Sequence, residues 1–429
     1  MLIDRRRFTG LFAGFIGGAA LPLPTLSAAR GAAWDPCALP GPIQALTPMT
    51  DGIVPITVAE RQGRMEKARR LMAQRGLGAI LLEPGTSMDY FTGMKWGLSE
   101  RPFVAVLPAK GELAFICPGF EEARARELLK LPADVRVWQE DESPYRLLAT
   151  ILRDRGVLSG RVGVEERLRF FVMDGVRTVA PTIQFASAEA VTAGCRMYKS
   201  ASEIALMQRA NDMTMAAFKA TFATLKEGMT QHEVTATMEA AMARVGGSDT
   251  WALAGLAAAS AFPHGTVQPQ QLREGDIVLL DSGCKVEGYQ ADITKTTVFG
   301  KPTARQTEIW NLERRAQDAA FAAARIGATC GSVDDAARKV ITDAGFGPGY
   351  KVPGLPHRTG HGIGMDGHEW TNFVKGNAAI IRPGMCFSDE PMIAIYGEFG
   401  IRLEDCLYIT ETGPRFFSPQ SVAIDRPIP

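Results

Sequence analysis

The feature that most constrains the fold is an internal repeat in the C-terminal half of the chain. The segment 272–281 (Leu-Arg-Glu-Gly-Asp-Ile-Val-Leu-Leu-Asp) aligns with the segment 381–390 (Ile-Arg-Pro-Gly-Met-Cys-Phe-Ser-Asp-Glu) at a constant offset of 109 residues. Each copy follows two segments with helical patterns, and a second carboxylate, Asp292 or Glu404, lies on a strand that returns after it. The repeat predicts two similar halves related by a pseudo-twofold axis, with Asp281 and Glu390 in equivalent places.

Four helices are expected in this half, two before each copy. Ser200 and Thr230 are each followed three residues later by glutamate, which is the pattern of a capping box at a helix start. The pair Ser332 and Asp335 predicts the start of the fourth helix in the same way. The expected helices span 200–226, 230–246, 303–326 and 332–345, and each ends at or near a glycine.

A glycine-rich segment, 357–369, lies between the fourth helix and the second copy of the repeat. It reads His-Arg-Thr-Gly-His-Gly-Ile-Gly-Met-Asp-Gly-His-Glu and holds three of the five histidines in the chain. Four glycines in thirteen residues disfavour a helix and predict an extended or turning backbone. The spacing of His357 and His361 therefore does not make a zinc-binding His-Glu-x-x-His helix, and residue 358 is also arginine rather than glutamate.

The four repeat-related carboxylates and one histidine predict a site for two metal ions. Asp281, Asp292, Glu390 and Glu404 would repel one another in a buried site unless they shared cations. Their four negative charges match two divalent ions, which would activate water for hydrolysis, and His361 would supply one nitrogen ligand. An oxygen-rich site favours Mn²⁺, with Co²⁺, Fe²⁺ or Zn²⁺ as alternatives.

Three further histidines and one arginine are candidates for catalysis. His264, His357 and His368 are expected to bind the substrate and move protons, because histidine titrates near neutral pH. Any one of them taken alone could instead be a structural residue. Arg402 lies two residues before Glu404, on the same face of a strand. It could pair with Asp292 or Glu404, hold the site electrostatically, or form a surface salt bridge. His232 lies inside a capping box and is expected at the surface.

The N-terminus predicts export rather than a membrane anchor. Residues 1–30 comprise a basic start with Arg5-Arg6-Arg7-Phe8, an apolar run and small residues, which is typical of a twin-arginine signal peptide. The apolar run is too short and too rich in glycine and proline to span a bilayer, so no stable membrane insertion is expected after cleavage. We therefore expect a periplasmic or secreted protein. Seven scattered cysteines without a Cys-x-x-Cys pair do not predict a disulfide framework, and those near the proposed ligands are expected to be small buried residues.

A length of 429 residues predicts two domains after the signal. Residues 55–195 alternate between strand and helix patterns, including a helix over 64–75 and a hairpin of 103–107 with 113–117, and predict an α/β domain. Residues 196–429 form the second domain and contain every proposed ligand. Equal numbers of basic and acidic residues, 47 each, give no basic stripe for a nucleic acid.

The motifs around the proposed ligands resemble those of the "pita-bread" metallopeptidases, the family of aminopeptidase P, prolidase, methionine aminopeptidase and creatinase. The matching positions are Asp281 in Leu-Asp-Ser-Gly, Asp292 in Ala-Asp-Ile-Thr, His361 in Gly-His-Gly-Ile-Gly, Glu390 in Asp-Glu-Pro and Glu404 in Arg-Leu-Glu-Asp. The resemblance covers about 55–429. It implies an α+β fold in which a creatinase/prolidase-type domain precedes a pita-bread catalytic domain with a pseudo-twofold repeat. It also implies a homodimer.

Within that family the proposed function is hydrolysis of the bond preceding proline in short peptides, by an Xaa-Pro dipeptidase or aminopeptidase. His264, His357 and His368 match the non-ligand histidines of this branch. The alternatives are a creatinase-like C–N hydrolase, a lyase acting on a small zwitterion, and a non-catalytic binding module. The creatinase-like and non-catalytic alternatives predict loss of metal ligands, whereas all five are present; the sequence does not exclude the lyase.

Overall fold

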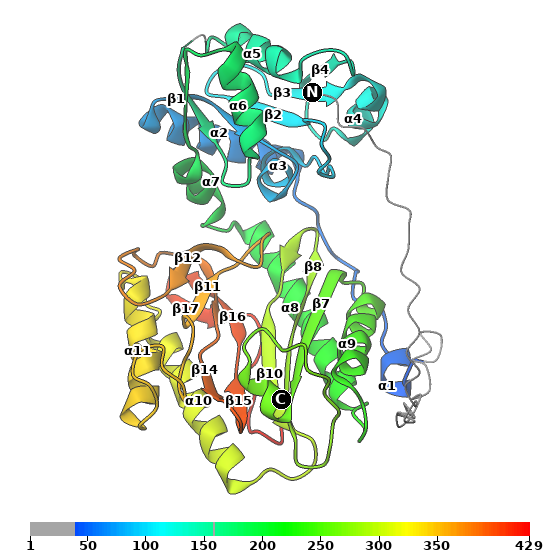
Figure 1. The fold of residues 1–429 in the computed structure, drawn as a ribbon, viewed down its shortest axis with the longest axis vertical. Coiled ribbons are helices and arrows are strands. Elements are labelled where there is room, and N and C mark those ends of the chain that lie inside the picture. The colour runs from blue at the N-terminus through cyan, green and yellow to red at the C-terminus, as the bar shows by residue number, and fades with distance from the viewer. Residues whose placement is uncertain (1–38, 158) are drawn as a thin grey trace, which may run out of the picture. The chain divides into compact units, whose positions relative to one another are not determined.

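The computed structural model describes residues 39–157 and 159–429 (Figure 1). The predicted export signal, residues 1–30, lies outside the described residues. Among the described helices, none combines the length and the apolar character needed to cross a bilayer. The six cysteines in the described part are all buried and free. The interpretation of Cys284, Cys386 and Cys406 as small buried side chains is therefore confirmed.

A six-stranded mixed sheet organises the N-terminal part, in the order β4-β3-β2-β1-β5-β6. The strands β2 and β3 form the predicted antiparallel hairpin, whereas β1 with β5 and β3 with β4 are parallel. The strands are β1 (Leu77–Leu82), β2 (Val104–Pro108), β3 (Ala114–Pro118), β4 (Asp134–Trp138), β5 (Gly160–Val164) and β6 (Ile183–Ser187). The helices are α2 (Val58–Arg75), α3 (Thr86–Thr92), α4 (Glu122–Leu128), α5 (Pro144–Asp154), α6 (Phe170–Val179) and α7 (Glu189–Arg196).

Alternation along the central strand divides the hydrophobic core of this part into two layers. Ile80 and Leu82 belong to one buried cluster, which also contains residues of α2. Ala79 and Leu81 belong to another, which contains residues of α5 and α6. Successive side chains of a strand point to opposite faces, so a strand that is apolar at every position is covered on both sides.

The C-terminal part contains the predicted repeat as two helix pairs, each packed against its own sheet (Figure 1). The first half has α8 (Ala201–Phe222) and α9 (Gln231–Val245) with β7 (Ser248–Leu256), β8 (Ile277–Val286), β9 (Tyr289–Gln290) and β10 (Ile293–Val298). The second has α10 (Ala304–Ala323) and α11 (Cys330–Asp343) with β11 (Gly360–Gly362), β12 (Glu369–Phe373), β13 (Cys386–Asp389), β16 (Asp405–Thr410) and β17 (Gly413–Phe416). A hairpin of β14 (Met392–Ile395) and β15 (Phe399–Arg402) joins β13 to β16.

The helix starts follow the local sequence, with one exception. Capping boxes are present at Ser200 with Glu203 and at Thr230 with Glu233, as predicted. The start predicted at Ser332 is wrong, because α11 begins earlier and its N-cap is Thr329, which accepts a hydrogen bond from the Ser332 N–H. The neighbouring Cys330 N–H bonds to Ala379 O, a contact between distant segments that fixes the chain just before the helix.

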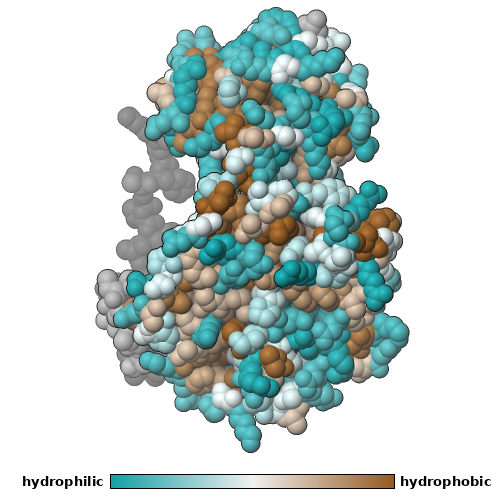
Figure 2. All heavy atoms as spheres, turned by 180° about the vertical axis from the view of Figure 1, so that it is seen from behind, coloured by the Kyte–Doolittle hydropathy of each residue, from teal (hydrophilic) through white to brown (hydrophobic). Residues whose placement is uncertain are grey.

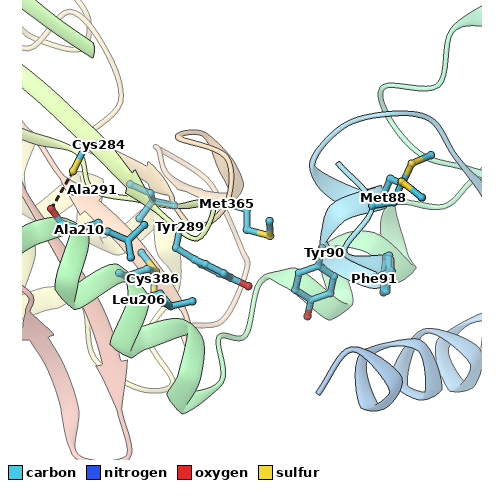
Figure 3. Packing of buried hydrophobic residues seen from close by; sticks show 14 of the residues in the cluster. Met88, Tyr90, Phe91, Leu206, Ala210, Cys284, Tyr289, Ala291, Met365 and Cys386 are labelled. Carbon is cyan, nitrogen blue, oxygen red and sulfur yellow. Dashed lines mark hydrogen bonds between the residues drawn. The ribbon is translucent and has the colours of Figure 1, made fainter. Parts of the chain in front are cut away.

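Buried polar groups accompany the hydrophobic packing between α2, α3 and α8. In Figure 3 the Tyr289 side chain extends toward the Tyr90 ring. The Tyr289 hydroxyl donates to Glu203 Oε1 at 2.8 Å and accepts from Arg64 Nη2 at 3.0 Å, while Arg64 Nη1 donates to Tyr90 O at 3.0 Å. The face drawn in Figure 2 carries hydrophilic residues interspersed with small hydrophobic areas, as expected from the balanced composition.

Candidate metal centre

The four predicted carboxylate ligands lie on or beside neighbouring strands of the two repeat halves. Asp281 lies within β8 and is opposite Thr294 of β10, the strand that begins directly after Asp292. Glu390 directly follows β13, and Glu404 directly precedes β16, which is paired with β13. The Glu404 N–H donates to Thr294 O at 3.0 Å, so the two halves meet at the site.

These carboxylates surround His361, which comes from the short strand β11. His361 Nε2 is 3.2 Å from Glu390 Oε1 and 3.7 Å from Asp292 Oδ2. Asp292, His361 and Glu404 each offer one ligand atom, and these atoms lie within 4.8 Å of one another. His361 Nδ1 lies 3.0 Å from Gly362 O, which leaves Nε2 directed at the carboxylates. The structure thus brings four of the predicted ligands together, and Asp281 lies close enough for its charge to raise the pKa values of the other three carboxylates.

The electrostatics of this cluster fit bound cations. Burial raises the pKa of Asp292 well above its usual value, and the carboxylates of Asp281 and Glu390 raise it further. Burial likewise raises the pKa of Glu404 well above its usual value and that of Glu390 to about 7. The Asp281 Oδ1 and Glu404 Oε1 atoms are buried without a hydrogen-bond partner. A divalent ion would satisfy these oxygens and remove the cost of gathering like charges.

Arg402 is part of the site rather than of a surface salt bridge. Its side chain is 2% exposed, and its Nη2 donates to Asp281 Oδ2 at 2.6 Å. Its Nε donates to Thr294 Oγ1 at 3.0 Å, and that hydroxyl donates to Glu404 Oε2 at 2.7 Å. Arg402 therefore pairs directly with Asp281 rather than with Asp292 or Glu404, and it is linked to Glu404 through the Thr294 hydroxyl.

The three other predicted histidines lie around the cluster. The His368 ring packs edge-on against the His361 ring, with centroids 4.1 Å apart. His357 Nδ1 lies 2.7 Å from Arg358 O, while its buried Nε2 has no hydrogen-bond partner. Burial, with a smaller contribution from Arg402, lowers the pKa of His357 to about 3, so this ring is neutral. His264 is exposed and close enough to influence the pKa values of His357 and His368.

Two glycines of segment 357–369, Gly360 and Gly362, are required by the closeness of neighbouring strands. A side chain at Gly360 would collide with Ser388 O of β13, and one at Gly362 would collide with the backbone of Trp370 in β12. The backbone of β11 is thus enclosed between two strands, which also explains why this segment is not a helix. His361 is held in this strand by its N–H, which donates to Ser388 Oγ at 3.0 Å.

The sequence of this chain is similar to those of known peptidases. The chain is 32% identical over 366 residues to the Xaa-Pro dipeptidase of Lactobacillus delbrueckii subsp. lactis, covering 83% of this chain and 97% of that protein. Residues 205–411 match the family model of metallopeptidase family M24. The chain belongs to metallopeptidase family M24. Residues 64–198 match the creatinase/prolidase N-terminal domain.

Solved structures of M24 relatives have the same fold. The dipeptidase PepE of Mycobacterium ulcerans superimposes with a TM-score of 0.78 at 30% identity, covering 85% of this chain and 97% of that one. A prolidase from Thermococcus sibiricus gives a TM-score of 0.77 at 26% identity, with 84% and 97% covered. The predicted fold, a creatinase-type N-terminal domain followed by a pita-bread domain, is confirmed, and the protein is a metallopeptidase.

Several residues that support the M24 site were not predicted from the sequence. Asp334 on α11 accepts from the Thr359 N–H at 3.0 Å and from the Thr359 hydroxyl at 2.8 Å, and Arg338 on the next turn donates to His357 O. Asp334 and Arg338 also pair with each other at 2.7 Å. Their spacing of four residues on a helix was visible in the sequence, but it indicates only a helical ion pair.

His232 lies with His264 in a surface hollow, which its local sequence did not indicate. It is exposed, as predicted, but it lines a hollow of about 460 Å³ together with His264. Leu253, which is opposite Asp281 in the sheet, lines the same hollow. The hollow therefore adjoins the metal centre through His264.

Proposed function

We propose that this metallopeptidase hydrolyses the peptide bond preceding proline in short peptides, as an Xaa-Pro dipeptidase or aminopeptidase. The observation that carries the proposal is the buried convergence of Asp292, His361 and Glu404, with Asp281 and Glu390 beside them and His357 and His368 around them. Relatives named Xaa-Pro dipeptidase and prolidase support the choice of bond.

In this proposal the five ligands hold two divalent ions per chain, with Mn²⁺ as the first choice. When bound, the ions would polarise the scissile carbonyl and activate water for attack. Arg402 keeps Asp281 oriented through the bond between Nη2 and Oδ2. The unpartnered Asp281 Oδ1 and Glu404 Oε1 are the oxygens left free for the ions.

The outer histidines suit a bond to proline. Such a bond is a tertiary amide, whose nitrogen has no N–H and leaves poorly unless it is protonated. His357 presents a buried, unpartnered Nε2, and the exposed His264 lies close enough to influence its pKa. His368 is also exposed and packs against the His361 ring. These groups would bind the substrate, and a ring that accepts a proton from the attacking water would then deliver that proton to the departing nitrogen.

The test is a panel of substrates with purified protein, with and without added Mn²⁺. We expect cleavage of Ala-Pro and Gly-Pro, much slower cleavage of Ala-Ala, and no reaction with creatine. A longer Xaa-Pro-Yaa peptide separates a dipeptidase, which rejects it, from an aminopeptidase, which releases its first residue. Hydrolysis of creatine instead of the dipeptides would assign the site to a C–N hydrolase.

We also propose that the protein is exported by the twin-arginine route to the periplasm or beyond and works as a homodimer. Replacing Arg5, Arg6 and Arg7 with lysine should leave a folded, active protein in the cytoplasm, because the export machinery reads paired arginines. Activity measured in periplasmic and cytoplasmic fractions checks this result. Arg30→Lys, outside the pair, is the matched control and should leave export unchanged. A normal periplasmic fraction of the triple variant would contradict the proposal.

A further inference from the structure

A fully buried charged network lies beside the metal centre, and the proposed mechanism does not use it. The Glu369 carboxylate is 1% exposed and pairs with Arg196 Nη2 at 2.5 Å and with Lys199 Nζ at 3.0 Å. Arg196 and Lys199 are 3% and 1% exposed in their side chains. Burial alone would raise the pKa of Glu369, but these two cations more than offset it and lower that pKa to about 2. Glu369 is therefore ionised at any working pH.

Glu369 also closes the loop that precedes it. Its Oε1 accepts hydrogen bonds from the N–H groups of Met365 at 3.0 Å and Asp366 at 3.1 Å. A side chain at Gly364 would lie 2.7 Å from Glu369 Oε2 and from Lys199 Cε, so glycine at 364 leaves room for this ion pair. One carboxylate thus fixes both ends of the segment 364–369.

The same loop is attached to the N-terminal part of the chain through Asp366. Its carboxylate accepts from Thr86 Oγ1 at 2.6 Å and from Arg196 Nη2 at 2.7 Å, and Arg167 lies 3.2 Å away. Thr86, Arg167 and Arg196 all lie within the creatinase/prolidase-type region, 64–198. The loop is therefore held from two sides, by Glu369 within itself and by Asp366 outside it.

His368 is the residue whose position depends on this attachment. It directly precedes Glu369, which is the first residue of β12 and is opposite Gly362 of β11. Its ring is exposed on one side and packs against the His361 ring on the other. The His368 ring has no hydrogen-bond partner among the described residues. The backbone on either side of His368 therefore sets the position of the ring.

We propose that Glu369 is a positioning residue, which, neutralised by Arg196 and Lys199, fixes the His368 ring against the metal centre. The network also makes the placement of His368 depend on residues of the N-terminal region. A displacement of about 1 Å of a catalytic group can cost about 10²-fold in rate. Proteins in which apolar residues replace a buried ion pair are often no less stable than the original. We therefore infer that the charges of Glu369, Arg196 and Lys199 position the loop more than they stabilise the fold.

The kinetic test compares Glu369→Gln with His368→Ala and with the double variant, and it rests on the proposed function because it uses Ala-Pro. Glu369→Gln should lower kcat by about 10²-fold with little change in KM and with full metal content. In the His368→Ala background it should cause no further loss, since both act through the same ring. If the fold-loss in kcat of the double variant equals the product of the losses in the two single variants, the proposal is overturned.

Two additional variants separate positioning from loss of folding. Lys199→Met keeps the Arg196–Glu369 pair and should show a smaller loss of kcat, again absent in the His368→Ala background. Asp134→Asn, on β4, breaks the pairs of Asp134 with Arg136 and Arg155 and should leave kcat unchanged. A loss of kcat in Asp134→Asn as large as that in Glu369→Gln would assign the effect to general destabilisation.

A measurement without turnover keeps the inference independent of the proposed function. The chain has only five histidines, so the ring signals of ¹³C-histidine-labelled, Zn²⁺-loaded protein can be assigned with single alanine variants. In Glu369→Gln the His368 signal should move and the His232 signal should stay. An unchanged His368 signal in Glu369→Gln would overturn the positioning role. A shifted His368 signal in Glu369→Gln, together with a wild-type protein that fails to cleave Ala-Pro, would refute only the proposed function.

Discussion

Replacing Glu390 with alanine is expected to abolish hydrolysis of Ala-Pro and to lower the bound metal. Glu390 Oε1 lies 3.2 Å from His361 Nε2, and Ser388 Oγ donates to the same oxygen at 3.1 Å, so the carboxylate is held at the centre of the ligand cluster. Enzymes accelerate reactions by about 10⁶-fold or more, and a hydrolase that depends on its metals should lose at least about 10⁴-fold of this without them. Metal analysis and Ala-Pro kinetics on the same preparation measure both effects.

The equivalent carboxylate of the first repeat half provides a second variant, and an exposed carboxylate of the β14–β15 hairpin provides a control. Asp281→Ala, at the equivalent position of the first half, should reproduce both losses. Glu398→Ala removes an exposed carboxylate from the β14–β15 hairpin, where it lies 3.6 Å from Arg305, and should change neither quantity. Full metal content in both Glu390→Ala and Asp281→Ala would refute the ligand assignment.

The outer histidines should separate metal binding from proton transfer. His357→Ala and His368→Ala are expected to keep their metal and to lose about 10²- to 10⁴-fold in kcat, the usual contribution of general acid–base catalysis. His361→Ala should lose metal and activity together, because its Nε2 faces Asp292 and Glu390. Metal content and kcat are measured for all three variants. Loss of metal in His357→Ala would place that ring among the ligands instead.

Local signals in the sequence predicted much of the fold. Capping boxes at Ser200 and Thr230 depend on residues three apart, so the starts of α8 and α9 could be read directly. The 109-residue repeat predicted that Asp281 and Glu390 occupy equivalent places, because equivalent segments fold alike. The start of α11 was missed because Thr329 and Ser332 are both acceptable N-caps, and a contact with the distant Ala379 decides between them.

The contacts that hold the site were less predictable because they join distant residues. Arg402 and Asp281 are 121 residues apart, and Arg196 and Glu369 are 173 apart. A charged residue in a sequence gives no indication of its partner, and an exposed salt bridge is the usual outcome for an arginine near an acidic residue. Residue types and the repeat therefore predicted which side chains converge. The roles of Thr294, Asp334 and Glu369 could be recognised only from contacts in the folded structure.

One measurement tests the proposed function most directly: the ratio of kcat/KM for Ala-Pro to kcat/KM for Ala-Ala. It is made on the Mn²⁺-loaded protein and again after a chelator has removed the metal. We expect Ala-Pro to be strongly preferred, activity to vanish with the metal, and activity to return when about two equivalents of Mn²⁺ are restored per chain. Equal rates on the two dipeptides, or full activity without metal, would contradict the proposal.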